Sequence, residues 1–147
     1  MNDASIDKAT LATLRPGMPA SALRTLCGPI WDEVKPGEDG WVVKLADIGF
    51  TARIDVKDTI GKLAFSAKFP STLSIDGLRI GMSFDDALAL FPNLRHIQDV
   101  IVSMMTLRRF GAARSDGTMV ELRFRDGRLL AFDLDRPDAV YGAAATT

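Results

Sequence analysis

The stretch Leu14-Arg15-Pro16-Gly17-Met18-Pro19 returns 64 positions later as Leu78-Arg79-Ile80-Gly81-Met82-Ser83. Leu26 and Leu90 keep the same spacing within the segments that follow. A repeated string of this kind marks the start of a structural unit that is used twice. The sequence therefore predicts an internal duplication, and the rest of the chain can be divided around these two starts.

A second pair of matched anchors follows the first pair in the same order. Leu63-Ala64-Phe65 with Pro70 is echoed 67 positions later by Leu130-Ala131-Phe132 with Pro137. A linker that contains turn residues separates the two copies. We expect one domain over 1–147, composed of repeat one at 14–70, a linker at 71–77, repeat two at 78–137 and a flexible tail at 138–147.

Each copy begins with helix signals. Ser83 can cap a helix over 84–91, and Asp86 stands three residues later, as in a capping box. Pro92 ends that helix. In the first copy Pro19 suits the first turn of a helix, and Gly28-Pro29 ends it. A short additional helix is expected between Ile6 and Leu14.

Apolar and polar residues alternate after each helix, which is typical of strands with one buried face. Asp126-Gly127 predicts a tight hairpin turn, since Gly tolerates positive φ. The alternating segments are 41–45, 52–57, 63–69, 120–125 and 130–135. The predicted fold is α+β, with two tandem repeats of a helix and about four antiparallel strands. These repeats form one sheet, and the helices pack on one face of it.

Composition excludes several classes of protein. The 147 residues carry 18 Lys and Arg against 19 Asp and Glu, a net charge of −1, so no general attraction to nucleic acid is expected. One Cys and one His exclude a disulfide framework and a Cys/His zinc site. No apolar stretch reaches the length of a membrane helix, and the first residues do not form a secretory signal. A cytoplasmic protein without cofactors is expected, although removal of a signal peptide would leave a similar sequence.

Candidate catalytic residues are few. Cys27 and His96 can be imagined as a nucleophile and its base, but Cys27 falls on the apolar face of a predicted helix. Asp133 and Asp135 lie on the same face of a predicted strand, a spacing that can suit a divalent ion or a glycosidase-like pair. A solvated face with salt bridges explains these two carboxylates more simply. The sequence therefore favours a protein without its own chemistry.

The predicted wet face of the sheet is the better candidate for function. Mixed charge on a rigid sheet can orient one partner and penalise others. Its predicted members are Arg53, Asp55, Lys57, Glu121, Arg123, Arg125, Asp133 and Asp135. The segment Ile101–Met105 is a second candidate, because Met adapts to irregular surfaces; packing of this segment in the core is the favoured interpretation.

Several of these motifs together resemble a known group. The run from Leu14 to Met18, then Leu26-Cys27-Gly28-Pro29, then Trp41 after a turn, is similar to one repeat of the SmpA/OmlA and β-lactamase-inhibitor-protein-like group. The resemblance implies a tandem fold whose sheet binds another protein.

The leading hypothesis is a non-enzymatic protein-binding module, in particular a cytoplasmic immunity protein or enzyme inhibitor that occludes its partner's active site. Its partner would be a toxin, an effector or an enzyme, and not nucleic acid or a membrane. Charge reversal at Arg123 and Arg125 is expected to weaken such binding. Two alternatives stay open: an SmpA-like envelope assembly or scaffolding module, and a small-molecule binder or unusual hydrolase. The protein is expected to be a monomer or a weak homodimer.

Overall fold

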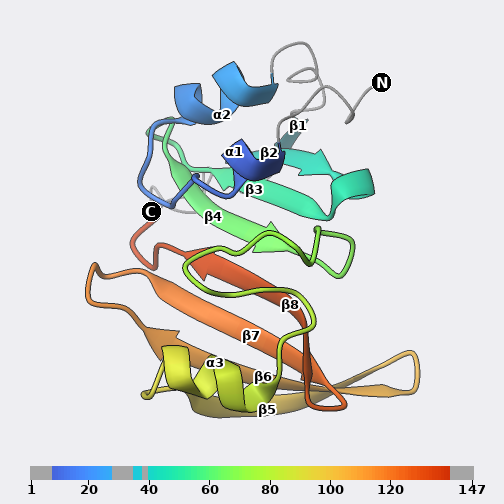
Figure 1. The fold of residues 1–147 in the computed structure, drawn as a ribbon. Coiled ribbons are helices and arrows are strands. Elements are labelled where there is room, and N and C mark those ends of the chain that lie inside the picture. The colour runs from blue at the N-terminus through green and yellow to red at the C-terminus, as the bar shows by residue number, and fades with distance from the viewer. Residues whose placement is uncertain (1–7, 28–34, 38–39, 140–147) are drawn as a thin grey trace.

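The computed structural model describes residues 8–27, 35–37 and 40–139, which form one antiparallel sheet of eight strands (Figure 1). The strand order across the sheet is β1-β2-β3-β4-β8-β7-β6-β5, so the first and the last four strands each stay together. The strands are β1 (Lys35–Gly37), β2 (Gly40–Leu45), β3 (Phe50–Ile54), β4 (Ile60–Phe65), β5 (Arg95–Val102), β6 (Met105–Ala113), β7 (Met119–Arg125) and β8 (Arg128–Asp135). The α+β class and the antiparallel sheet are confirmed.

In the described ranges, three short helices accompany the sheet: α1 (Lys8–Leu11), α2 (Ala20–Cys27) and α3 (Phe84–Leu90), with a 3-10 turn, η3, at Ala46–Ile48. α3 begins where the capping signal predicts, because Ser83 Oγ accepts a hydrogen bond from the backbone N–H of Asp86 at 3.2 Å. α1, α3 and the loop between β4 and α3 lie in front of the sheet in Figure 1. No described helix packs on the opposite face.

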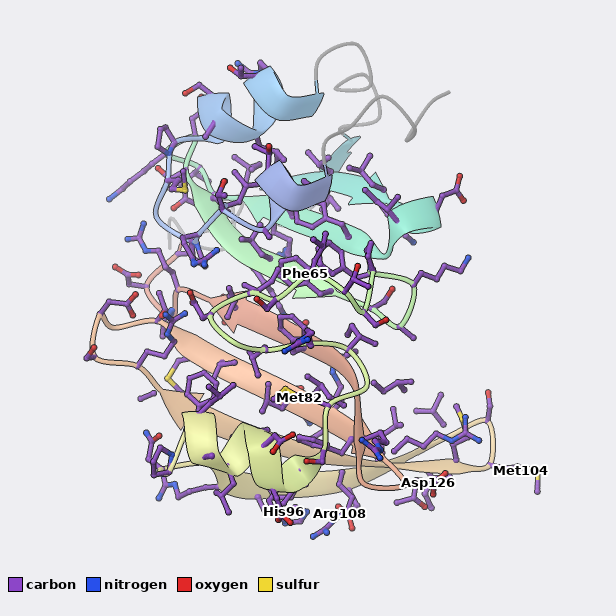
Figure 2. All side chains as sticks on the ribbon, viewed as in Figure 1. Phe65, Met82, His96, Met104, Arg108 and Asp126 are labelled. Atoms are coloured by element: carbon purple, nitrogen blue, oxygen red, sulfur yellow. The ribbon has the colours of Figure 1, made fainter. Side chains whose placement is uncertain are left out.

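The core lies between the sheet and these covering segments. Phe65 on β4 stacks on Phe132 of β8 with ring centroids 4.9 Å apart, and Phe50 and Phe69 meet Phe65 edge-on. All four rings are at most 2% exposed. Figure 2 places Phe65 near the middle of the molecule, where strands from the first and second halves of the chain meet. A single apolar cluster therefore continues from one half to the other.

The similar stretches 14–19 and 78–83 make equivalent backbone hydrogen bonds. Gly17 N–H donates to Ile60 O at 2.7 Å, and Ile60 N–H donates to Met18 O at 2.8 Å. Gly81 N–H donates to Leu129 O, and Leu129 N–H donates to Met82 O, each at 2.8 Å. Each stretch is thereby held against the beginning of the last strand of its half.

Gly17 and Gly81 have φ of 99° and 93°, a conformation that L side chains rarely adopt. These hydrogen bonds match Ile60 with Leu129, a spacing of 69 residues, whereas the second anchors of the sequence have a spacing of 67. Leu63 then corresponds to Phe132 rather than to Leu130.

β4 and β8 join the halves at the centre of the sheet. They pair Leu63 with Leu134 and Phe65 with Phe132, and Ala64 faces Asp133 at the midpoint. Under the alignment that matches Ile60 with Leu129, Ala64 and Asp133 are equivalent positions. The ladder is therefore arranged nearly symmetrically about this point. Asp133 is the polar residue at the middle of the whole sheet.

Three strand predictions are wrong in detail. The predicted strand 52–57 ends at Ile54, because a turn begins at Asp55. β4 ends at Phe65, because the chain turns at 66–69, and Phe69 reaches the core from that turn. The segment Ile101–Met105 is not core. It forms the end of β5, a turn with positive φ at Ser103 and Met104, and the start of β6. Ile101 is 78% exposed and Met104 is 98% exposed.

Some expectations fall on residues outside the described ranges. These are the first helix exit at Gly28-Pro29, the turn residue Asp39, and most of the tail, from residue 140 onward. The expected N-terminal helix is observed as α1, which is four residues long. Within the described ranges, no helix is long and apolar enough to cross a membrane.

Candidate functional site

The site is built on the face of the sheet opposite the helices, which we call the open face. Residues that pair across neighbouring antiparallel strands project on the same side, so the strand register identifies its members. One row runs across seven strands from Lys44 through Asp133 and Glu121 to Arg95. Among the described side chains, the charged residues of the open face are Lys44, Arg53, Lys62, Arg95, Arg109, Glu121, Arg123, Arg125, Asp133 and Asp135. Arg128 pairs with Arg125 but is not counted with them, because its Nη1 donates to Gly81 O at 3.3 Å at the edge of β8.

Ion pairs connect five of these side chains in a network at the centre. Arg109 donates two hydrogen bonds to Glu121, from Nε and Nη2, each at 2.9 Å. Arg123 donates to Asp133 at 2.6 Å and lies 3.8 Å from Glu121. Lys62 Nζ lies 3.6 Å from the other oxygen of Asp133. The network thus crosses β6, β7, β8 and β4, and each member restrains its neighbours.

The two carboxylates at the centre differ in their environment. Burial raises the pKa of Asp133, whose side chain is only 8% exposed, although Arg123 and Lys62 act in the opposite direction. Hydrogen bonds from Arg109 lower the pKa of Glu121, and the same pair raises the pKa of Arg109. Asp133 is therefore a buried carboxyl group whose ionised form depends on the nearby cations Arg123 and Lys62. Glu121 is stabilised in its ionised form by Arg109.

Six of the eight residues that the sequence predicts lie on the open face, and Asp55 and Lys57 do not. The backbone leaves the strand after Ile54, and Asp55 sits in the β3–β4 turn, 4% exposed. Its Oδ1 accepts hydrogen bonds from the backbone N–H groups of Lys57 and Thr59 at 2.9 and 3.1 Å. Lys57 is an exposed residue of the same turn. Asp55 therefore stabilises the turn, as Asp side chains commonly do.

Four cations of the open face are absent from the residues predicted for it: Lys44, Lys62, Arg95 and Arg109. Lys44 and Lys62 do alternate with apolar neighbours, so the same signal that selected Arg53 was present. Arg109 and Arg95 belong to β6 and β5, two strands in which the apolar alternation is weak. Only the strand pairing places these two residues on the face that holds Glu121.

The other candidate groups lie apart from the network. His96 is on the edge strand β5, where its Nε2 lies 2.7 Å from Asp99 Oδ1. Figure 2 shows His96 and Arg108 at the lower edge of the molecule, below α3. Cys27 is the last residue of α2. Within the described ranges, no three His, Cys, Asp or Glu side chains are grouped as a metal site would require.

A comparison with family models decides to which family the chain belongs. One model covers residues 6–143, nearly the whole sequence. The chain belongs to this family, a domain of unknown function, DUF7256. No curated protein matches the sequence. The open face is therefore a surface of a DUF7256 domain, and its role is inferred from its geometry.

The open face of this DUF7256 domain is hollowed where β5 and β6 meet β7. Gly111 forms the floor, since a Cβ placed there would lie 2.9 Å from Ile97 Cδ1. Ile97, 48% exposed, thus lies across β6 and borders a hollow of about 230 Å³ together with Met119, Glu121 and Asp135. Apolar side chains (Ile97 and Met119) and carboxylates (Glu121 and Asp135) therefore lie next to each other where β5, β6 and β7 meet.

Beyond this hollow, the β5–β6 hairpin extends away from the sheet, with Met104 at its tip (Figures 1 and 2). Of the eight large hydrophobic residues that are exposed in the described ranges, four are in this region: Ile97, Ile101, Val102 and Met104. Isolated exposed hydrophobic residues are common, but a group of them on one element marks a surface that can bind another molecule.

Proposed function

We propose that this DUF7256 domain is a non-enzymatic protein-binding module, most specifically a cytoplasmic immunity protein or enzyme inhibitor that uses its open face to occlude the active site of a toxin, effector or enzyme. The observation that carries the proposal is the ion-pair network of Lys62, Arg109, Glu121, Arg123 and Asp133. These side chains are already held by one another. Binding would therefore cost less side-chain entropy than it would for free side chains.

The β5–β6 hairpin supplies large exposed apolar side chains, which the ion-pair network does not contain. Binding hot spots are commonly large side chains that become fully desolvated, and a charged sheet alone offers few of them. Ile101 and Met104 are apolar, are exposed and stand at the end of the same sheet. A partner that covered the open face and the hairpin together would meet a charged centre flanked by an apolar anchor.

The proposal includes the tandem architecture. Two features support a duplication: the matched hydrogen bonds of Gly17 and Gly81, and the near-symmetric pairing of β4 with β8. In each half four strands follow the helical segment, which is α1 and α2 in the first half and α3 in the second. This arrangement supports the resemblance to the SmpA/OmlA and β-lactamase-inhibitor-protein-like group, in which a tandem sheet binds another protein.

The experiment is affinity capture from the native host with matched variants. Arg125→Glu tests the open face, because Arg125 is half exposed and its loose pair with Asp126 is 3.7 Å long. Arg123 is avoided, because its loss would leave Asp133 buried with one cation fewer. Ile101→Asp with Met104→Asp tests the hairpin. The controls are Arg79→Glu and Leu88→Asp, two exposed positions on the other side of the sheet.

We expect one stoichiometric protein partner with the wild-type chain and with both controls. Either test variant should weaken binding by about 2 kcal/mol or more if it removes a hot spot. Inhibition is then measured as the loss of the captured partner's activity. The absence of a stoichiometric partner, or equal capture by test and control variants, would contradict the proposal.

A further inference from the structure

The charges of the open face are not balanced as those of the whole chain are. Of the side chains that the structure describes, seven cations and three carboxylates project from it, a formal excess of four positive charges, whereas the whole chain carries −1. The rest of the molecule must then carry a formal excess of five negative charges. The near-neutral composition therefore conceals a separation of charge between the open face and the rest of the protein.

The depth of the side chains strengthens this separation. The carboxylate of Asp133 is 8% exposed and that of Glu121 is 27% exposed. Arg125 is half exposed, and Lys44 and Arg95 are exposed at opposite ends of the row that passes through Asp133. Asp133 lies at the base of the network, Glu121 is about as exposed as its partners Arg109 and Arg123, and the more exposed cations Lys44, Arg95 and Arg125 surround them. A molecule that approached the open face would meet positive potential first.

We propose that the open face binds an acidic surface of a partner protein, in which Asp and Glu side chains face Lys44, Arg95 and Arg125. The inference rests on the proposed function and adds the chemistry of the partner. Cations at the rim raise the association rate of an oppositely charged protein and disfavour neutral or basic ones. The hollow beside Ile97 and Met119 accommodates an apolar side chain of the same partner.

A nucleic acid is the less favourable polyanion. At least four of the seven cations, Lys62, Arg109, Arg123 and Arg125, already pair with carboxylates of the chain itself. Glu121 and Asp135 lie among the cations and would repel a continuous phosphate backbone. Separate acidic side chains of a folded protein can instead be placed between these carboxylates. The apolar hairpin at the end of the sheet also suits a protein surface better than a phosphate backbone.

The test uses defined probes and two variants of equal charge. The probes are a short acetylated peptide of alternating Glu and Gly, the same peptide with Lys in place of Glu, and a DNA duplex. Lys44→Gln with Arg95→Gln removes two cations from the open face. Lys68→Gln with Arg79→Gln removes two exposed cations elsewhere. Affinity is measured at fixed low ionic strength, and NMR shifts of backbone amides locate the binding surface.

We expect the Glu peptide to bind in a salt-dependent manner and to shift amides of β8, β7 and β6. Loss of Lys44 and Arg95 should weaken binding by about fivefold, as for two exposed ion pairs, whereas loss of Lys68 and Arg79 should not. The inference is overturned by four results: no binding of the Glu peptide, equal weakening by both variants, equal binding of the Lys peptide, or tighter binding of DNA through the same residues. Self-association in low salt, detected by sedimentation, would assign the open face to a second copy and would also overturn it.

Rejection of an acidic partner can be distinguished from rejection of the protein-binding role. If affinity capture yields a partner that depends on Arg125 and the hairpin, but the Glu peptide does not bind, the protein-binding role stands and the acidic character of the partner is rejected. If no partner is captured, the protein-binding role itself fails.

Discussion

At the scale of single residues, the pair Arg109 and Glu121 offers a test of the network. Hydrogen bonds from Arg109 lower the pKa of Glu121, so the pair stabilises the fold above the unfolded pKa of Glu, about 4.3. This contribution is lost as the pH falls through the lower pKa of the folded state. We expect Arg109→Gln to reduce the free energy of unfolding by about 1–2 kcal/mol at pH 7, and by less at pH 3. Urea unfolding at both pH values measures this.

Arg108→Gln provides the matched control. Arg108 is 59% exposed and its contact with Asp99 is 3.5 Å long, so its loss should change the free energy of unfolding by less than about 0.5 kcal/mol. An equal cost for the two variants at pH 7 would mean that the network on the open face is no more ordered than an ordinary surface ion pair.

The residue scale also shows where sequence reasoning was limited. Asp55 continues the alternation of β3, but its carboxylate accepts two backbone hydrogen bonds in the turn. An Asp can satisfy either role, and the sequence pattern does not decide between them. Lys62 and Arg109 became recognisable only when strand pairing placed them beside Asp133 and Glu121. Register depends on contacts between distant parts of the chain, and local patterns do not encode it.

At the scale of elements, the local signals with a direct chemical cause were the reliable ones. The cap at Ser83 and the turn at Asp126-Gly127 were predicted correctly, because each rests on a specific hydrogen bond or a positive φ. The Ile101–Met105 segment was misjudged, because its apolar composition indicates a core strand. Ser103 and Met104 nevertheless form a turn with positive φ, which neither residue type favours.

The two glycine turns at the start of each half give a prediction at this scale. Gly17 and Gly81 both have positive φ, and each N–H donates to the first residues of the last strand of its half. We expect Gly17→Ala and Gly81→Ala each to reduce the free energy of unfolding by about 1–2 kcal/mol, because alanine is strained in this conformation. Chemical denaturation measures both values. Costs that differ by more than about 1 kcal/mol would argue against equivalent roles in a duplicated fold.

At the scale of the whole molecule, the composition gives the net charge correctly but does not show how the charged residues are distributed over the surface. A net charge of −1 correctly indicates that the chain has no general excess of basic residues. Within the described part of the chain, the sheet nevertheless places seven of the 18 cations on one face beside three carboxylates. A sum over the sequence cannot detect this separation, because it follows from the way eight strands align. Electrostatic inference therefore requires the fold as well as the composition.

The continuous core leads to a prediction about cooperativity. Phe65 contacts Phe50 and Phe69 within its own half and stacks on Phe132 of the other half, so the halves share their largest buried rings. We expect both halves to unfold in one transition. Both tryptophans, Trp31 and Trp41, belong to the first half, so their fluorescence reports on that half, whereas far-UV circular dichroism reports on the entire chain.

The two signals should therefore give the same midpoint in urea. Phe65→Ala should cost about 3–5 kcal/mol, because it removes a buried ring and leaves a cavity at the junction of β4 and β8. Hydrogen exchange should then become faster in β2 and in β7 alike, although β7 belongs to the other half. Fluorescence that changes at a lower urea concentration than circular dichroism, or faster exchange confined to the first half, would mean that the two halves fold independently. In that case the open face would not be one rigid surface, and a partner that requires residues from both halves would bind only at the cost of aligning them.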